Sequence, residues 1–176
     1  VLWLAGNTGD RRPMIQLRYE TGDPQGTLFT AILAAGETGA VDGLDLDSGI
    51  VSPTIIDGFD SGVPHGQARV GVSFPGWVTG ERIRLDVWGY VASLETETDF
   101  NGNDSFTPWT VGASWHVPLI DTLALRGEIW YGQALSDIRG TIGQNVNVLK
   151  GDEIQGWGGW MELTWQLTPE LKLVLG

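Results

Sequence analysis

The chain has 176 residues, including 26 glycines and 9 tryptophans but no cysteine, which excludes disulfides and thiolate metal sites. Its net charge of −12, from 10 basic and 22 acidic residues, argues against a nucleic-acid partner, because phosphate binding needs clustered lysine and arginine. No run approaches the roughly 18 to 20 consecutive apolar residues that a membrane-spanning helix requires. Glycine and aromatic residues favour turns and strands over helices, so we expect a single all-β domain over residues 1–176.

Alternation of apolar and polar residues predicts about nine strands along the chain. In chain order they are 1–5, 14–20, 27–34, 67–74, 82–91, 109–117, 123–133, 157–167 and 171–175. The segment 27–34 is ambiguous, because its apolar residues would also suit a short buried helix. The strands 109–117, 123–133 and 157–167 have nine to eleven residues, the length that a tilted strand needs to cross a membrane.

The predicted strands have one apolar and one charged face. In 82–91, for example, Leu85 and Val87 alternate with Arg84 and Asp86. Aromatic residues lie near both strand ends on the apolar face, as in the aromatic girdles of membrane barrels: Trp109, Tyr131 and Trp157 at one end, Trp115 and Trp165 toward the other.

The connections between these strands alternate in length. Short turns are expected at 20–26, 75–81, 118–122 and 168–170, and long loops at 35–66, 95–108 and 134–156. All long loops then fall at one end, as in outer-membrane barrels with short periplasmic turns and long extracellular loops. The sequence therefore predicts part of a transmembrane antiparallel β-barrel. A secreted β-sandwich, either carbohydrate-binding or a surface structural protein, is the alternative.

The charged strand faces supply the candidate pore-lining residues. These are Arg18, Glu20, Arg69, Arg82, Arg84, Asp86, Arg126, Glu128, Glu162 and Lys172. Six are basic and four acidic, so the wall is mildly positive although the loops 35–66 and 95–108 carry ten acidic residues and no basic one. We expect Arg84 and Arg126 to favour the passage of anions.

The acidic loop 35–66 contains a weak calcium motif. Asp45 and Asp47 partly imitate a calcium-binding loop, but the downstream glutamate of the EF-hand pattern is missing. A solvated acidic loop without a bound ion is the alternative, and no other cofactor is expected.

No catalytic pattern stands out. His65 is expected in a loop and His116 on a strand, and the chain has no nucleophile elbow, metalloprotease motif or phosphate loop. Asp86 and Glu128 could be taken for a glycosidase pair, but salt bridges with the nearby Arg84 and Arg126 explain them more simply. We therefore do not expect an enzyme.

Three segments, 11–19, 64–72 and 158–169, resemble stretches of Gram-negative porins, most closely the DcaP-like trimeric group. The resemblance implies a homotrimeric channel in the bacterial outer membrane, in contact with lipid and lipopolysaccharide, that passes small hydrophilic solutes through a lumen narrowed by an inward-folded loop. Such porins are longer than 176 residues, and a closed single-chain bacterial barrel has an even number of strands. We therefore expect the chain to be a fragment of a larger barrel.

Overall fold

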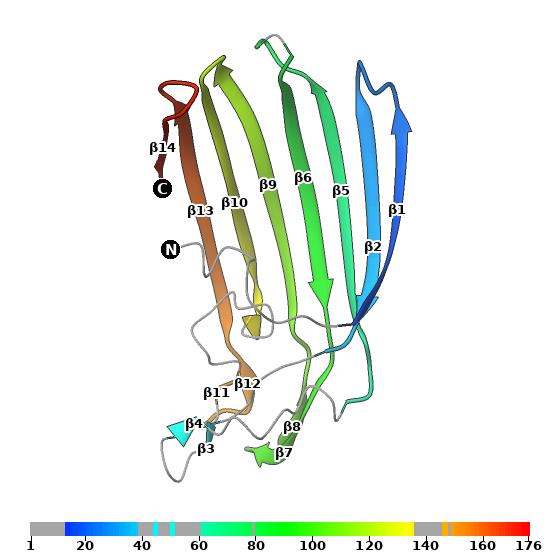
Figure 1. Ribbon diagram of the computed structural model, residues 1–176. Helices are drawn as coiled ribbons and strands as arrows, with labels where there is room; N and C mark the ends of the chain where they lie inside the picture. Colours follow the sequence, from blue (N-terminus) through cyan, green and yellow to red (C-terminus); the bar gives the residue numbers. More distant parts are fainter. Residues whose placement is uncertain are drawn as a thin grey trace.

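The chain is all-β, and its main element is one large antiparallel sheet. The computed structural model describes residues 13–38, 44–45, 50–51, 61–78, 80–135, 146–147 and 149–176. Eight strands form the sheet in the order β1-β2-β5-β6-β9-β10-β13-β14, so each strand pairs with its neighbours along the chain (Figure 1). Among the described residues the sheet is not closed, and β1 and β14 are its two edges.

The sheet strands are β1 (Met14–Gly22), β2 (Leu28–Gly36), β5 (His65–Pro75), β6 (Arg82–Val91), β9 (Trp109–Ile120), β10 (Leu123–Gln133), β13 (Gln155–Gln166) and β14 (Lys172–Leu175). Three two-stranded pairs accompany it: β3 (Leu44–Asp45) with β4 (Ile50–Val51), β7 (Leu94–Phe100) with β8 (Asn103–Phe106), and β11 (Val146–Asn147) with β12 (Asp152–Glu153).

Eight of the nine predicted strands are confirmed by the eight strands of this sheet, and the ambiguous segment 27–34 corresponds to β2. The ninth, 1–5, lies outside the described residues. The predicted turn at 118–122 is too long, because β9 continues to Ile120. Pro118 lies inside this strand, where the register with β10 shifts between Leu123 and Ala124. Proline cannot donate to a strand ladder, and such an irregularity accommodates it.

The connections differ in length at the two ends of the sheet. Those between β1 and β2, β5 and β6, β9 and β10, and β13 and β14 are short and lie together at the top of Figure 1. The connections from β2 to β5, β6 to β9 and β10 to β13 are long, and the three two-stranded pairs within them lie at the bottom. We call these the short-turn end and the long-connection end.

The segment 95–108, predicted as a loop, is instead mostly a β-hairpin of β7 and β8. Asn101 and Gly102 form its turn with φ values of 56° and 86°. An Asn-Gly pair with positive φ at both positions is the preferred two-residue hairpin turn. Leu94 and Phe106, both 1% exposed, pack with Val146 into a hydrophobic cluster at this end of the molecule.

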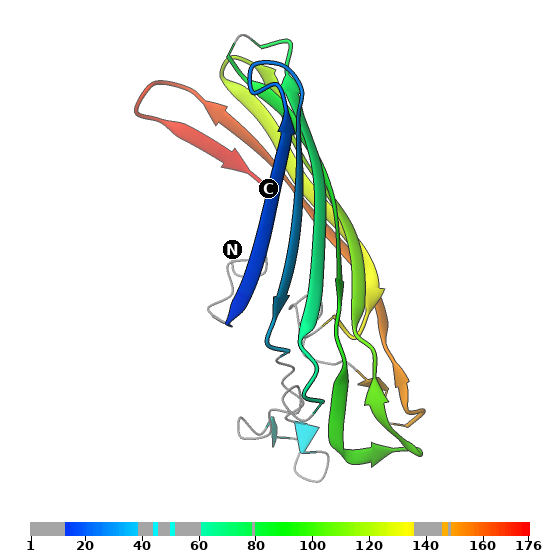
Figure 2. The same cartoon turned by 90° about the vertical axis from the view of Figure 1, so that its right-hand side faces the viewer.

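The large sheet is a single twisted layer (Figure 2). Residues alternate between its two faces, and on β6 Leu85, Val87 and Val91 are exposed while Asp86 and Tyr90 are buried. We call the face with Leu85 and Val87 the apolar face and the face with Arg84 and Asp86 the polar face. Side chains fan apart on the convex side of a curved sheet and crowd on its concave side, so this contrast indicates that the polar face is concave. None of the helical structure in the described residues is long and apolar enough to cross a membrane.

Candidate functional site

The ten charged residues predicted from alternation all lie on the polar face. The strand register places Arg18 and Glu20 on β1, Arg69 on β5, Arg82, Arg84 and Asp86 on β6, Arg126 and Glu128 on β10, Glu162 on β13 and Lys172 on β14. Since neighbouring strands are about 4.8 Å apart, this pairing brings charged residues that are distant in the sequence together on one surface.

Asp86 is the centre of the most connected cluster on this face. Its Oδ2 lies 2.9 Å from Nη2 of Arg69 and 3.0 Å from Nε of Arg84. Arg69 also donates from Nη2 to the hydroxyl of Ser114 on β9, over 3.0 Å. The Asp86 side chain is 3% exposed, whereas those of Arg69 and Arg84 are 40% and 42% exposed. One buried carboxylate therefore holds two guanidinium groups that remain open to solvent.

Arg126 and Glu162 form a second pair of the same kind. Nη2 of Arg126 lies 2.6 Å from Oε1 of Glu162, which also accepts a hydrogen bond of 2.9 Å from the hydroxyl of Thr164. The Glu162 side chain is 9% exposed and that of Arg126 46%. Here too the acid is buried and the guanidinium is open.

Glu128 departs from the expected pairing. Asp86 and Glu128 were both predicted to be salt-bridged, and for Asp86 this is confirmed, with Arg69 and Arg84 as its partners, whereas Arg126 binds Glu162 and not Glu128. In the described part of the chain Glu128 forms no ion pair, and it lies in register with Ser114 on one side and Trp160 on the other.

The remaining charged residues lie toward the margins of the face. Arg18 pairs with Glu20 over 2.6 Å on the edge strand β1, where both side chains are half exposed. Arg82 donates to the hydroxyl of Ser73 and to three backbone carbonyl oxygens, two of which belong to the turn between β1 and β2. Lys172, on the last strand β14, lies opposite Gln166 of β13.

His65, expected in a loop, is instead the first residue of β5 and is 2% exposed. Its Nδ1 donates to the carbonyl oxygen of Glu37 over 2.9 Å, its Nε2 lies 3.0 Å from the amide nitrogen of Gln67, and its ring lies 5.2 Å from that of Tyr90. Sequence reasoning missed this cluster, because nothing local shows that a histidine after a long connection is packed. His116 lies on β9 as expected, between Arg84 and Arg126 in register.

Among the described residues the apolar face carries no ion pair, and it is widely exposed. Ile15, Leu17, Val70, Val87 and Ile129 are between 56% and 77% exposed. Trp157, at the long-connection end, is 83% exposed, and the ring of Tyr131 lies edge-on to Trp109, 5.7 Å between centroids. Of the three aromatic residues predicted at this end, Tyr131 and Trp157 are exposed and Trp109 is half-buried.

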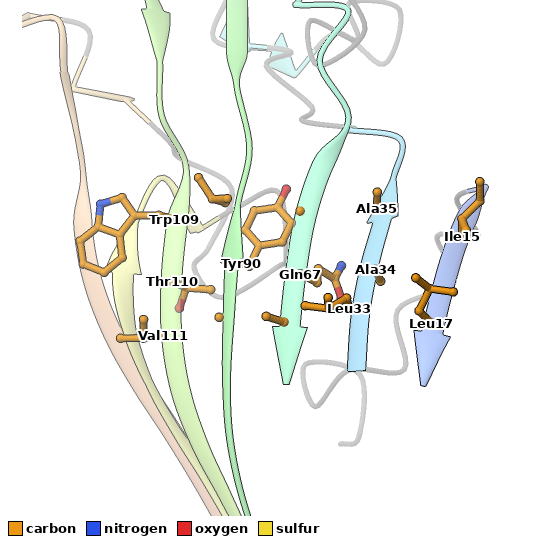
Figure 3. Close-up of a pocket in the computed structure, with 14 residues that line it drawn as sticks. Ile15, Leu17, Leu33, Ala34, Ala35, Gln67, Tyr90, Trp109, Thr110 and Val111 are labelled. Atoms are coloured by element: carbon orange, nitrogen blue, oxygen red, sulfur yellow. The ribbon is translucent and has the colours of Figure 1, made fainter. Parts of the chain in front are cut away.

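A shallow hollow of about 660 Å³ lies at the long-connection end of the sheet (Figure 3). Small residues of β2, β5 and β6, such as Ala35, Gly66 and Gly89, lie between Leu17 on one side and Trp109 on the other. Its lining is nearly all apolar. Gln67, Tyr90 and Thr110 also border it, but the strand register places them on the polar face, so the candidate site is that opposite face.

The predicted calcium site is largely beyond what the structure describes. Asp45 ends the short strand β3, and Asp47 lies outside the described residues. Within the described ranges no three histidine, aspartate or glutamate side chains are grouped as a metal ion would require. The calcium site stays a prediction.

Comparison of the chain with protein-family models, with curated proteins and with solved structures finds no match.

Proposed function

We propose that the chain forms part of the wall of an outer-membrane β-barrel, and that this barrel is a porin-like channel through which small hydrophilic solutes diffuse. The observation that carries the proposal is the inverted contrast between the two faces of the sheet. The apolar face is exposed, with Val87 at 63%, while the polar face carries buried, bonded carboxylates, with Asp86 at 5%. Such a sheet suits lipid outside and water inside.

Strand length supports a membrane-spanning sheet. β5, β6, β9, β10 and β13 have 10 to 12 residues each, whereas strands of globular proteins have mostly five or six. A tilted strand needs about 9 to 11 residues to cross the hydrocarbon layer. The five central strands therefore have the length of transmembrane strands.

The alternative, a secreted β-sandwich, needs a second sheet packed about 10 Å from the apolar face. In the described ranges the only other sheets are the three two-stranded pairs, which lie at the long-connection end (Figure 1). They leave the apolar face uncovered, so the barrel wall is the better proposal.

The open edges of β1 and β14 require further strands in this proposal. Unpaired backbone groups are not tolerated in the hydrocarbon layer, and spanning sheets are closed for that reason. We propose that strands from other residues of the protein complete the barrel. On the resemblance to DcaP-like porins we also propose a homotrimer in contact with lipid and lipopolysaccharide.

Spin labels on the two faces test the proposal in the full-length protein, reconstituted in lipid vesicles. Labels at Leu85, Val87, Leu125, Ile129 and Leu163 are expected to be accessible to oxygen and shielded from polar relaxation agents. Labels at Ser114 and Thr164, on the polar face of β9 and β13, serve as matched controls and are expected to show the reverse. Equal access of polar agents to both faces, or the absence of ion conductance in planar bilayers, would contradict the proposal.

A further inference from the structure

A row of residues across four strands of the polar face alternates tryptophan with glycine. Trp88 on β6 pairs with Gly112 on β9, Gly112 pairs with Trp130 on β10, and Trp130 pairs with Gly158 on β13. The two tryptophans are two strands apart, about 10 Å at the usual strand spacing. We call these four residues the tryptophan floor.

Both indoles lean over the neighbouring strand. Atoms Cε2 and Cζ2 of Trp88 occupy the space that a Cβ atom at Gly112 would need. The same atoms of Trp130 lie 2.8 and 2.6 Å from the position of a Cβ at Gly158. Any larger residue at either glycine would push the indole away from the sheet. Both tryptophans are only half-buried, so part of each ring remains open on the polar face.

Polar groups border the floor on both sides. On the short-turn side the next row contains Asp86, Ser114 and Glu128 in register, and on the long-connection side it contains Gln67, Tyr90 and Thr110. Asp86, Tyr90 and Thr110 are buried, at 5%, 7% and 1% exposure. The rim groups that a ligand can reach are therefore Ser114, Gln67 and Glu128, which are half-buried, and Glu128 has no ion-pair partner in the described part of the chain. The floor is therefore an apolar strip between two rows of hydrogen-bonding groups.

Several buried polar atoms around the floor have no hydrogen-bond partner among the described residues. They are Nε1 of Trp130 within the floor, Nε of Arg69 at its β5 end, and the hydroxyl of Tyr90, which is 7% exposed. Buried polar groups in native proteins are nearly always hydrogen-bonded, because leaving them unpaired is costly. Their concentration here points to a polar ligand.

We propose that the tryptophan floor binds the pyranose rings of a neutral saccharide. The C–H face of a pyranose is apolar and stacks on an indole, while its hydroxyl groups need hydrogen-bonding partners along the rim. Tryptophans with carboxylate, amide and hydroxyl groups on both sides offer this combination. A purely apolar ligand would leave the rim unpaired. The inference rests on the channel proposed above and names a class of solute for it.

Single-channel recording with maltotriose tests this inference in the full-length protein. Maltotriose is expected to block the ion current transiently, with an affinity that falls roughly tenfold, about 1.4 kcal/mol, in Trp88→Ala and in Trp130→Ala, because each variant removes one of the two indoles on which a pyranose stacks. Trp157→Ala is the matched control. That tryptophan lies on the apolar face and is 83% exposed, so its loss is expected to leave the block unchanged.

The outcomes separate this inference from the channel proposal. A conducting channel that maltotriose does not block, or a block unchanged in both tryptophan variants, overturns saccharide binding and leaves the channel intact. A block by benzoate with none by maltotriose likewise overturns it. If the protein does not conduct at all, the channel proposal fails, and quenching of tryptophan fluorescence by maltotriose in detergent still decides the saccharide site. Should Trp88→Ala not fold, as judged by heat-modifiable migration, Trp88→Phe retains an aromatic ring, and a smaller loss of affinity is expected.

Discussion

The two faces of the same strands differ in how far their side chains are bonded to one another and covered. On the polar face Asp86 is held by two arginines and Glu162 by an arginine and a threonine, so the charges are bonded and partly covered. On the apolar face Val87 and Ile129 are 63% and 56% exposed and nothing described packs over them. A water-soluble sheet buries its apolar face instead. In the proposed barrel wall this difference suits lipid on one side and water on the other, and substitutions on each face test it.

The largest effect is expected from a charge at the middle of the apolar face. Val87 lies in the central row, in register with Val70 and Ala113. Val87→Arg is expected to lower the free energy of unfolding from lipid vesicles by about 2 to 4 kcal/mol, because a cation would face the midplane of the bilayer. Thr21→Arg, on the same face but at the short-turn end, serves as the control and is expected to cost about 0 to 1 kcal/mol. Equal costs at the two positions in urea titrations would show that the face is not in lipid.

A smaller loss of stability is expected when the buried carboxylate of Asp86 on the polar face is removed. Asp86→Ala leaves Arg69 and Arg84 without their shared carboxylate, and breaking a buried ion pair is costly. Since both arginines are about 40% exposed, water offsets part of the loss, and we expect about 1 to 2 kcal/mol.

Glu20→Ala provides the comparison within the same face. Glu20 pairs with Arg18 on the edge strand, where the side chains are 42% and 50% exposed, so its loss is expected to lower stability less than the loss of Asp86 does. Unfolding of both variants in urea measures the difference. If Glu20→Ala proves the more costly, the polar face is not organised around Asp86.

Replacing the solvent-exposed arginines Arg84 and Arg126 is expected to change stability least but to change ion selectivity. Arg84 and Arg126 are 42% and 46% exposed, while their partners Asp86 and Glu162 are 3% and 9% exposed, so the wall presents more positive than negative charge to the solvent. Arg84→Ala and Arg126→Ala are expected to shift the reversal potential in a potassium chloride gradient toward cation preference. The anion preference of the unaltered channel should grow with ionic strength, because salt screens the acidic charges of segments 35–66 and 95–108 beyond about 8 Å at physiological concentration.

Lys150→Ala is the control for this measurement. Lys150 is exposed at the long-connection end and lies off the sheet, so its removal is expected to change the reversal potential little. Unchanged selectivity in both arginine variants would mean that the arginines only stabilise the wall.

The hairpin of β7 and β8, which was not predicted, has a recognisable signal in the local sequence. Asn101 and Gly102, placed in a loop, are the preferred residues of a two-residue hairpin turn, and attention to that pair would have predicted β7 and β8. The extension of β9 past Pro118 had no such signal, because proline inside a strand is normally evidence against it. Only the irregular pairing with β10 makes room for it.

From the sequence alone the eight strands of the large sheet, their two faces and the alternation of short and long connections could be predicted. These follow from a two-residue period and from turn residues, which are properties of neighbouring positions. Tertiary structure decided which side chains meet. Arg126 binds Glu162, 36 positions away, and not the nearby Glu128, and Trp88 and Trp130 each lie over a glycine of the next strand. Such partners depend on the register between strands, which the sequence alone did not reveal.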